Sequence, residues 1–249
     1  MNVLEVQWLT KRYPAFTLNG VSFAVPEGAV TGFIGRNGAG KSTTLKSILG
    51  MVHPDAGEVR VFGMDYAANE RAVRRELGVV LGGIDFYPKK KLRVITDVTR
   101  RFYDNWDEDK YRHYLRLFAI DEEKRVDQLS SGMKVKYMIA LALSHNARLL
   151  ILDEPTSGLD PVSRDELTEL LRRIVADGTR SVLFSTHITS DLEKCATHIA
   201  FIKDGELQYT GALDDFRTHY KDVGATLEDI IVHVERRPLD EGADEGAII

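Results

Sequence analysis

The stretch VTGFIGRNGAGKSTTLKSILG, residues 30–50, decides the fold because it contains a strand, a loop and a helix in one run. The β-branched and aromatic residues 30–34 predict a strand, and residues 43–49, followed by Gly50, predict a helix. Between them GRNGAGKST (residues 35–43) fits the P-loop pattern, in which two glycines precede Lys-Ser. The sequence therefore predicts an α/β fold with a P-loop core and a mostly parallel sheet.

The residue types in this loop explain why it would bind phosphate. Gly38 and Gly40 lack a Cβ, so the backbone can turn tightly and direct N–H groups at phosphate oxygens. Lys41 would reach the β- and γ-phosphates, and the Ser42 hydroxyl would coordinate Mg²⁺. The alternative is a glycine-rich turn that precedes a helix by chance. The predicted nucleotide-binding residues of the loop are Gly35, Asn37, Gly38, Ala39, Gly40, Lys41, Ser42 and Thr43.

Composition narrows the classes of partner. The chain has 249 residues and a formal net charge of −5, which gives no reason to propose nucleic acid as a partner. Its single cysteine, Cys195, excludes an internal disulfide and suits a reducing cytosol. No segment resembles a signal peptide, and no apolar run approaches the roughly 20 residues that cross a bilayer. We expect no direct membrane insertion, so any membrane contact would come through a partner.

The N-terminal part predicts a β-rich layer. Residues 3–9 and 16–25 read as strands, with Asn19-Gly20 as a turn. Between them the segment 11–14 reads as an exposed turn that carries Tyr13. This aromatic ring could stack on an adenine, or it could pack at a strand end.

A helical insert is predicted after the strand at residues 77–81. Asp107 would open a helix whose apolar side chains recur at helical spacing. A weaker helical pattern covers residues 96–104, and the insert would extend to about residue 145. The apolar residues of the predicted helix are Tyr111, Tyr114, Leu115 and Phe118.

The C-terminal half predicts further α/β units. Leu149–Leu152 reads as a buried parallel strand, and Asp160-Pro161 would start a helix. Residues 180–185 predict the next strand, Ser190 would cap another helix, and Asp204-Gly205 would join a hairpin. The acidic residues 235–249 predict a frayed tail.

Two carboxylates follow the strand at 149–152, where parallel sheets bind ligands. Asp153 is placed to hold Mg²⁺ through water, and Glu154 can act as the general base that activates the attacking water. The alternative is an acidic strand end exposed to solvent.

Together with the P-loop and the Asp153-Glu154 pair, further motifs make residues 1 to about 215 resemble an ATP-binding cassette (ABC) ATPase subunit. LSSGM (residues 129–133) resembles the family's signature, DEPTSGLD (153–160) its Walker B and D-loop, and His187 its switch histidine. The resemblance implies a helical subdomain inserted at about 84–145 and a C-terminal extension at 216–249.

The resemblance also implies a mechanism with ATP and Mg²⁺ as cofactors. Two subunits, identical or different, would pair head to tail, so that Ser130 and Gly132 of one bind the γ-phosphate held by the other's P-loop. His187 would sense that phosphate beside Glu154. The alternatives are that Ser130 only caps a helix and that His187 is structural.

The implied function is an ATPase subunit, peripheral on the cytoplasmic membrane face, that powers transport through separate membrane-spanning permease subunits. The short span from Gly82 to the signature and the C-terminal segment 226–230 resemble those of bacterial ABC-2 type exporters. Some of these exporters handle antimicrobial peptides or drugs. One alternative is a soluble ABC ATPase of translation or repair. A second is an ATP-gated subunit with very slow hydrolysis.

Two departures from the family pattern bear on turnover. Gly82-Gly83 stands where the family has a Gln that ligates Mg²⁺ and water, and Asp85 or water could replace it. Ser131-Gly132-Met133 stands where the signature has Gly-Gly-Gln. Because Ser130 and Gly132 are kept, we expect nucleotide binding to survive both changes.

Overall fold

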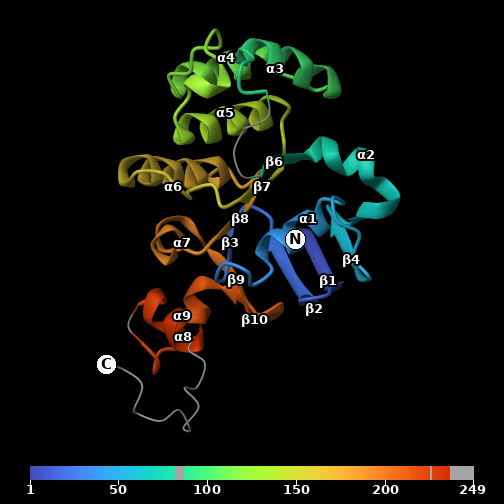
Figure 1. The fold of residues 1–249 in the computed structure, drawn as a ribbon, viewed down its shortest axis with the longest axis vertical. Helices are drawn as coiled ribbons and strands as arrows, with labels where there is room; N and C mark the ends of the chain where they lie inside the picture. The colour runs from blue at the N-terminus through green and yellow to red at the C-terminus, as the bar shows by residue number, and fades with distance from the viewer. Residues whose placement is uncertain (82–86, 225, 236–249) are drawn as a thin grey trace.

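The computed structural model describes residues 1–81, 87–224 and 226–235, and it contains two β-sheets. Figure 1 shows the sheets in the middle of the molecule with helices above and below them. The smaller sheet has the order β2-β1-β4-β5 and the larger one β10-β9-β3-β8-β7-β6. The strands are β1 (Asn2–Tyr13), β2 (Phe16–Pro26), β3 (Val30–Ile34), β4 (Ala56–Val61), β5 (Met64–Asp65), β6 (Leu77–Leu81), β7 (Leu149–Asp153), β8 (Ser181–Thr186), β9 (His198–Lys203) and β10 (Glu206–Ala212).

The larger sheet is parallel except for β10, which pairs antiparallel with β9. Its central strands β3 and β8 are buried along their whole length, as strands of a parallel sheet covered on both faces are. In the register, Ile34 lies opposite Thr186 and Leu81 opposite Asp153. Parallel register brings the carboxyl ends of these strands to one edge, where ligands bind in open α/β sheets. The predicted α/β fold with a mostly parallel sheet is confirmed.

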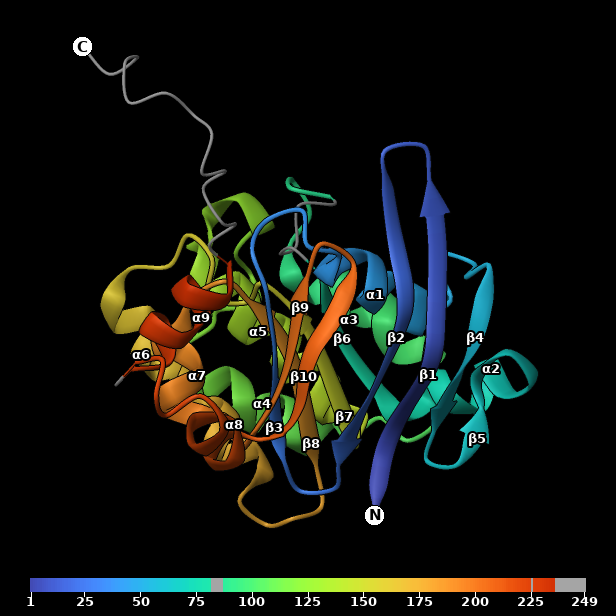
Figure 2. The same cartoon turned by 90° about the horizontal axis from the view of Figure 1, so that it is seen from below.

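The smaller sheet is antiparallel and forms the predicted N-terminal β layer; Figure 2 shows the long hairpin of β1 and β2. The predicted turn at 11–14 is wrong in part, because β1 continues to Tyr13 and the chain reverses at Pro14 and Ala15. Asn19-Gly20 is not a turn either, since β2 continues through it. Gly20 instead adopts a φ of 61°, at the register shift opposite Leu9 to Lys11 of β1.

The helices cover both faces of the larger sheet. Alternate residues of β7 divide between two apolar cores: Leu150 and Leu152 pack with α5, α6 and α7, whereas Leu149 and Ile151 pack with α1 and the smaller sheet. The helices are α1 (Lys41–Ile48), α2 (Tyr66–Glu76), α3 (Leu92–Thr99), η1 (Arg100–Phe102), α4 (Glu108–Leu117), η2 (Val126–Gln128), α5 (Ser131–Ser144), α6 (Pro161–Val175), α7 (Thr189–Cys195), α8 (Leu213–His219) and α9 (Leu227–Glu235).

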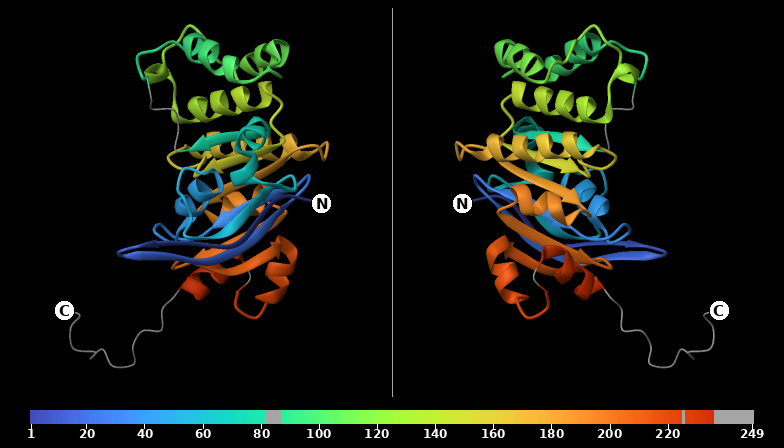
Figure 3. Two further views of the ribbon diagram at one scale, coloured as in Figure 1. Left: turned by 90° about the vertical axis from the view of Figure 1, so that its right-hand side faces the viewer. Right: turned by 90° about the vertical axis from the view of Figure 1, so that its left-hand side faces the viewer.

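The helices α3, α4 and α5 form a separate layer with its own apolar cluster, and Figure 3 shows α3 and α4 at one end of the molecule, beyond α5. A buried hydroxyl network joins the three helices: Thr96 Oγ1 lies 2.8 Å from Tyr111 OH and 2.7 Å from Tyr137 OH. Burial raises the pKa of both tyrosines. Asp107 caps α4 as predicted, because its carboxylate accepts a hydrogen bond from Lys110 N at 2.9 Å.

Two capping predictions in the C-terminal half have different outcomes. Asp160 caps α6 as predicted, and its Oδ1 accepts from Val162 N and Ser163 N. The predicted cap at Ser190 is wrong, because α7 begins at Thr189 after Ile188. The hairpin at Asp204-Gly205 is confirmed by the pairing of β9 with β10.

Within the ranges that the structure describes, no helix combines the length and apolar character needed to span a bilayer.

Candidate nucleotide-binding site

The P-loop connects β3 to α1 and turns through glycines that a side chain would disrupt. Gly38 and Gly40 have φ values of 87° and 112°, in the left-handed region that favours glycine. A Cβ at Gly35 would lie 2.3 Å from the carbonyl oxygen of Ile202, so this position also excludes a side chain. A Cβ at Gly38 would meet no atom within 4 Å, which places this residue at the open side of the loop.

Lys41 is the charged centre of the loop. Its side chain is only 5% exposed, and its ammonium group donates to the carbonyl oxygens of Gly35 at 2.7 Å and Arg36 at 3.2 Å. The same Nζ lies 3.0 Å from Glu154 Oε1, which gives this buried cation a counter-charge. The structure thus joins two residues that were predicted from separate motifs.

Glu154 lies between two groups at the end of β7. Its Oε1 faces Lys41, and its Oε2 lies 2.8 Å from His187 Nδ1. The residue has a φ of 49°, which is uncommon outside glycine. His187 is 40% exposed, so the solvent can reach its ring.

Ser185, in buried strand β8, fixes both carboxylate residues. Its hydroxyl donates to Asp153 Oδ1 at 2.6 Å and accepts from the backbone N–H of Glu154 at 2.9 Å. This bridge holds the strained turn at Glu154. No role was predicted for Ser185 from the sequence. The pattern that could have indicated one is a polar residue in a buried strand, two positions before His187.

A cleft of about 230 Å³ opens over the loop. Phe16, from the start of β2, contributes an aromatic ring to it and was also missed in the sequence. Tyr13, which pairs with Phe16 across the hairpin, is not among the lining residues, and its role at adenine stays a prediction. The cleft is lined by Phe16, Arg36, Asn37, Gly38, Gly40, Lys41, Ser42, Thr43 and Glu154.

The remaining loop residues support the turn from behind. Ala39 is buried, donates its N–H to Arg36 O at 3.1 Å, and accepts from Gly205 N at 3.0 Å. The Gly35 carbonyl binds Lys41, as described above. Gly35 and Ala39 therefore shape the loop, whereas the other predicted loop residues face the cleft.

These residues fit a nucleoside triphosphate with Mg²⁺. Within the described chain, α1 begins with no side-chain cap and no acidic residue in its first turn, so its first N–H groups are left for an anion. Ser42 and Asp153 have the oxygen ligands that Mg²⁺ prefers. When bound, Mg²⁺ supplies positive charge to the phosphate oxygens.

Comparison with known proteins agrees with this geometry. The family model described as "ABC transporter" matches residues 18–157. The chain is 31% identical to the bacitracin transport ATP-binding protein BcrA of Bacillus licheniformis over 208 residues, which are 82% of this chain and 68% of BcrA. This chain belongs to the ABC transporter family.

Two further relatives agree with this membership. The Nod factor export ATP-binding protein I of Burkholderia orbicola is 36% identical over 215 residues, which are 84% of this chain and 70% of that protein. A solved structure of an ATP-binding subunit of an ABC transporter superposes with a TM-score of 0.83 at 30% identity, over 94% of this chain and 100% of that one. As a family member, the chain is an ATPase subunit of a transporter with ATP and Mg²⁺ as cofactors.

The signature residues of this ABC ATPase lie apart from the P-loop cleft. Ser130 caps α5, because its Oγ accepts from Met133 N at 3.2 Å. At Gly132 a Cβ would lie 3.4 Å from the Ser163 side chain, so this position packs against α6. Neither residue lines the cleft that holds Lys41 and Glu154. The Gly82-Gly83 departure and Asp85 lie outside the described residues.

Proposed function

We propose that this ABC ATPase drives export through separate membrane-spanning subunits, by ATP-driven closure with a second ABC ATPase subunit. Glu154 lines the cleft and contacts both Lys41 and His187, which supports a hydrolytic site rather than a passive nucleotide sensor. A relative named for Nod factor export supports the direction of transport. The second subunit is identical or different; either satisfies the proposal.

Each residue of the site would have its own role in ATP hydrolysis. Glu154 is the general base toward water, and His187 orients it and contacts the γ-phosphate. Lys41 leaves the Glu154 carboxylate for the phosphates when ATP binds, since the β- and γ-phosphates carry more negative charge. Ser42 and Asp153 hold Mg²⁺, directly and through water.

The dimer would complete the site from the opposite side. Ser130 and Gly132 lie at the N-terminus of α5, where free N–H groups and a hydroxyl can bind an anion. Their separation from the chain's own cleft supports a role toward another subunit's nucleotide. ATP would then hold two subunits together, and hydrolysis would release them.

This function assigns the protein a peripheral place on the cytoplasmic face of the membrane. We propose residues 1–215 as the ATPase domain, with a helical insert at about 84–145 and an extension at 216–249. The apolar cluster that α3, α4 and α5 share supports the insert as a unit.

The test is assembly with the membrane subunit. The purified chain should bind a membrane-spanning subunit encoded beside it, and its ATP turnover should rise on binding. Co-purification with ribosomes or DNA instead would support the soluble alternative and overturn the proposal.

A further inference from the structure

We infer that the buried ion pair of Arg164 and Asp191, between α6 and α7, positions His187 beside Glu154. This inference rests on the role that the proposed function gives to His187, and it adds two positioning residues to that site. Asp191 lies in the first turn of α7, and Arg164 lies at the end of the first turn of α6. Neither residue lines the nucleotide cleft, so both would act through His187.

The turn at His187 is fixed by hydrogen bonds on both of its sides. Thr186 ends β8, and its Oγ1 accepts from Ile188 N at 3.0 Å. The Asp191 N–H donates to the carbonyl oxygen of Ile188 at 3.3 Å and closes the first turn of α7. A shift of α7 at Asp191 would therefore move the backbone next to His187. Because His187 Nδ1 lies 2.8 Å from Glu154 Oε2, such a shift would change this contact.

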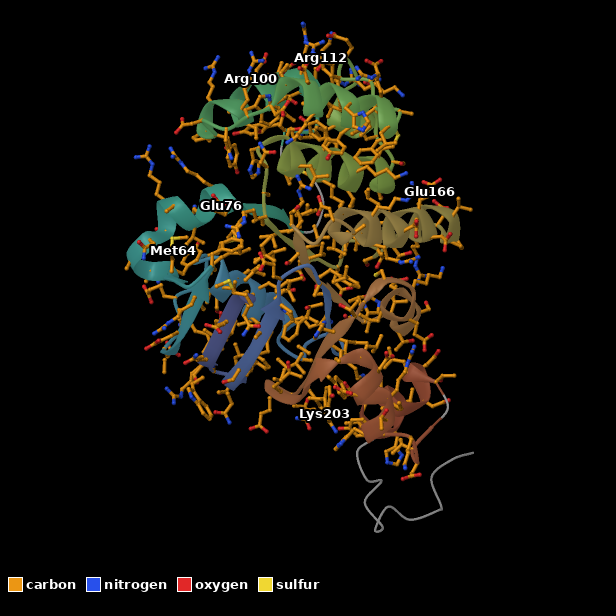
Figure 4. The ribbon with its side chains drawn as sticks, turned by 180° about the vertical axis from the view of Figure 1, so that it is seen from behind. Met64, Glu76, Arg100, Arg112, Glu166 and Lys203 are labelled. Carbon is orange, nitrogen blue, oxygen red and sulfur yellow. The ribbon has the colours of Figure 1, made fainter. Side chains whose placement is uncertain are left out.

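The buried ion pair ties this turn of α7 to α6. Asp191 Oδ1 lies 2.7 Å from Arg164 Nη2, and the two side chains are 2% and 26% exposed. The same guanidinium group donates to Ser190 Oγ at 3.3 Å. Figure 4 shows α7 beside α6, which is marked by labelled Glu166. The contact thus fixes α7 against its neighbour within one helical turn of His187.

Both partners belong to helices that begin soon after a site residue. The segment that contains Glu154 leads to Asp160, which caps α6, and the Arg164 N–H donates to the Asp160 carbonyl oxygen at 3.0 Å. On the other side, α7 begins two residues after His187. The ion pair therefore joins the two chain segments that leave the site. Such a contact sets how Glu154 and His187 lie relative to each other.

Stability alone does not explain this pair. Arg164 Nε and Asp191 Oδ2 are buried, and neither atom has a hydrogen-bond partner among the residues that the structure describes. A buried ion pair with polar atoms left unpaired is often no more stabilising than apolar side chains that fill the same space. A directional contact, however, favours one placement of α7 against α6. This preference is what a positioning role requires.

A second ion pair between the same two helices provides a matched control. Lys194 Nζ lies 2.7 Å from Asp165 Oδ1, and these side chains are 48% and 68% exposed. Exposed pairs contribute little, because water screens the charges. Lys194 also lies farther from His187 along α7. The control variant Lys194→Ala/Asp165→Ala should therefore hydrolyse ATP at the wild-type rate.

The test replaces the buried pair by apolar side chains in the full chain. Arg164→Met/Asp191→Val leaves no buried charge without a partner, so it should fold, and denaturant titration checks this. We expect kcat to fall about tenfold or more, because small misplacements of a site residue are costly. The KM for ATP should stay near the wild-type value, since the P-loop is untouched.

A conservative variant repeats the test with the charges kept. Arg164→Lys retains a cation for Asp191, so the fold should persist even if the apolar replacement does not fold. Lysine lacks the planar fork of arginine and contacts a carboxylate as a point charge. We expect a smaller loss of kcat than in Arg164→Met/Asp191→Val, again with little change in KM. A wild-type kcat in both variants would overturn the inference.

The same substitutions in a His187→Ala background separate positioning from general structure. Measured by single-turnover hydrolysis, they should cause no further loss there, because the group that they position is absent. An equal fold loss in both backgrounds would show a merely structural role and overturn the inference while the proposed function stands. Wild-type turnover by His187→Ala itself would refute the role that the proposed function gives to His187, and the inference with it.

Discussion

At the scale of single residues, the site is organised by the two groups that contact Glu154. Lys41 and His187 take one carboxylate oxygen each, at 3.0 Å and 2.8 Å. Glu154, the proposed base, is thus in direct contact with Lys41. Since a phosphate chain attracts Lys41 more strongly than one carboxylate does, binding of ATP would free one oxygen of Glu154 toward water. Nucleotide binding and activation of the base are then a single event.

Ser185 is expected to act as a positioning residue for this pair. Ser185→Ala removes the bridge to Asp153 Oδ1 and Glu154 N, at a cost of about 1–3 kcal/mol. If this loss raises the free energy of the transition state by the same amount, kcat falls roughly tenfold to a hundredfold. We expect the KM for ATP to change less, because Lys41 and the loop backbone are untouched.

The control for this prediction lies on the same strand. Ser181 is also buried in β8, and its Oγ accepts from Gly28 N at 3.0 Å, at the end of the strand away from the cleft. Ser181→Ala should reduce stability without a selective loss of kcat. Equal kcat losses in the two variants, measured by steady-state ATPase assays, would refute the positioning role.

The aromatic partner of adenine can be tested at the same scale. Phe16 lines the cleft and Tyr13 does not, so Phe16→Ala should weaken ATP binding more than Tyr13→Ala. Loss of one base–aromatic stack costs about 1–3 kcal/mol, or about tenfold in Kd. Phe16→Tyr should bind like wild type. A larger effect of Tyr13→Ala in direct titration would return the role to Tyr13.

At the scale of elements, the N-terminus of α5 has two separable roles. Ser130→Ala removes a helix cap worth about 1 kcal/mol, and under the proposed function it also removes a γ-phosphate ligand for the partner subunit. Asp107→Ala removes the equivalent cap from α4. We expect similar losses of stability, but only Ser130→Ala should impair ATP-dependent dimer formation in light scattering. If both variants dimerise equally, Ser130 is only a cap.

The sequence was sufficient for the elements whose causes are local. The strand before the P-loop, β6 and β7, and the caps Asp107 and Asp160 were all predicted, because apolar runs and capping residues act within a few positions. Sequence patterns gave a wrong prediction where tertiary contacts determine the local structure. Ser190 seemed a cap, yet its Oγ accepts from Arg164 of α6 at 3.3 Å, and α7 starts earlier.

Within the site, the local motifs were likewise predictable, but the contacts between them were not. The P-loop and the Asp153-Glu154 pair were recognisable as separate motifs. The contact between Lys41 and Glu154 was not predictable, since strand order alone brings β3 and β7 to the two sides of β8. Phe16 and Ser185 were missed for the same reason: each lies in a strand far from the other site residues in sequence, and only the tertiary fold brings Phe16 to the cleft and Ser185 to Asp153 and Glu154.

At the scale of the whole molecule, His145 links stability to pH. Burial lowers its pKa from 6.5 to about 4, so between these values the unfolded chain binds a proton that the folded chain does not. The free energy of unfolding should therefore fall as pH decreases through this window, by up to about 3 kcal/mol. Denaturant titrations at pH 7 and pH 4.5 would measure this loss.

The variant His145→Phe keeps a ring against Tyr103 but cannot titrate. Its stability should depend less on pH over the same window, with a residual slope from His198, whose pKa is also lowered by burial. A slope equal to that of wild type would show that His145 is not the group responsible.

We propose that Glu154 is the base of an ATPase site that it forms with Lys41 and His187. The most direct test is single-turnover hydrolysis of ATP by Glu154→Gln, with Glu166→Gln on the surface of α6 as control. We predict that Glu154→Gln binds ATP and Mg²⁺ but hydrolyses it at least about a hundredfold more slowly, while Glu166→Gln matches wild type. Hydrolysis by Glu154→Gln at the wild-type rate would show that Glu154 is not the base.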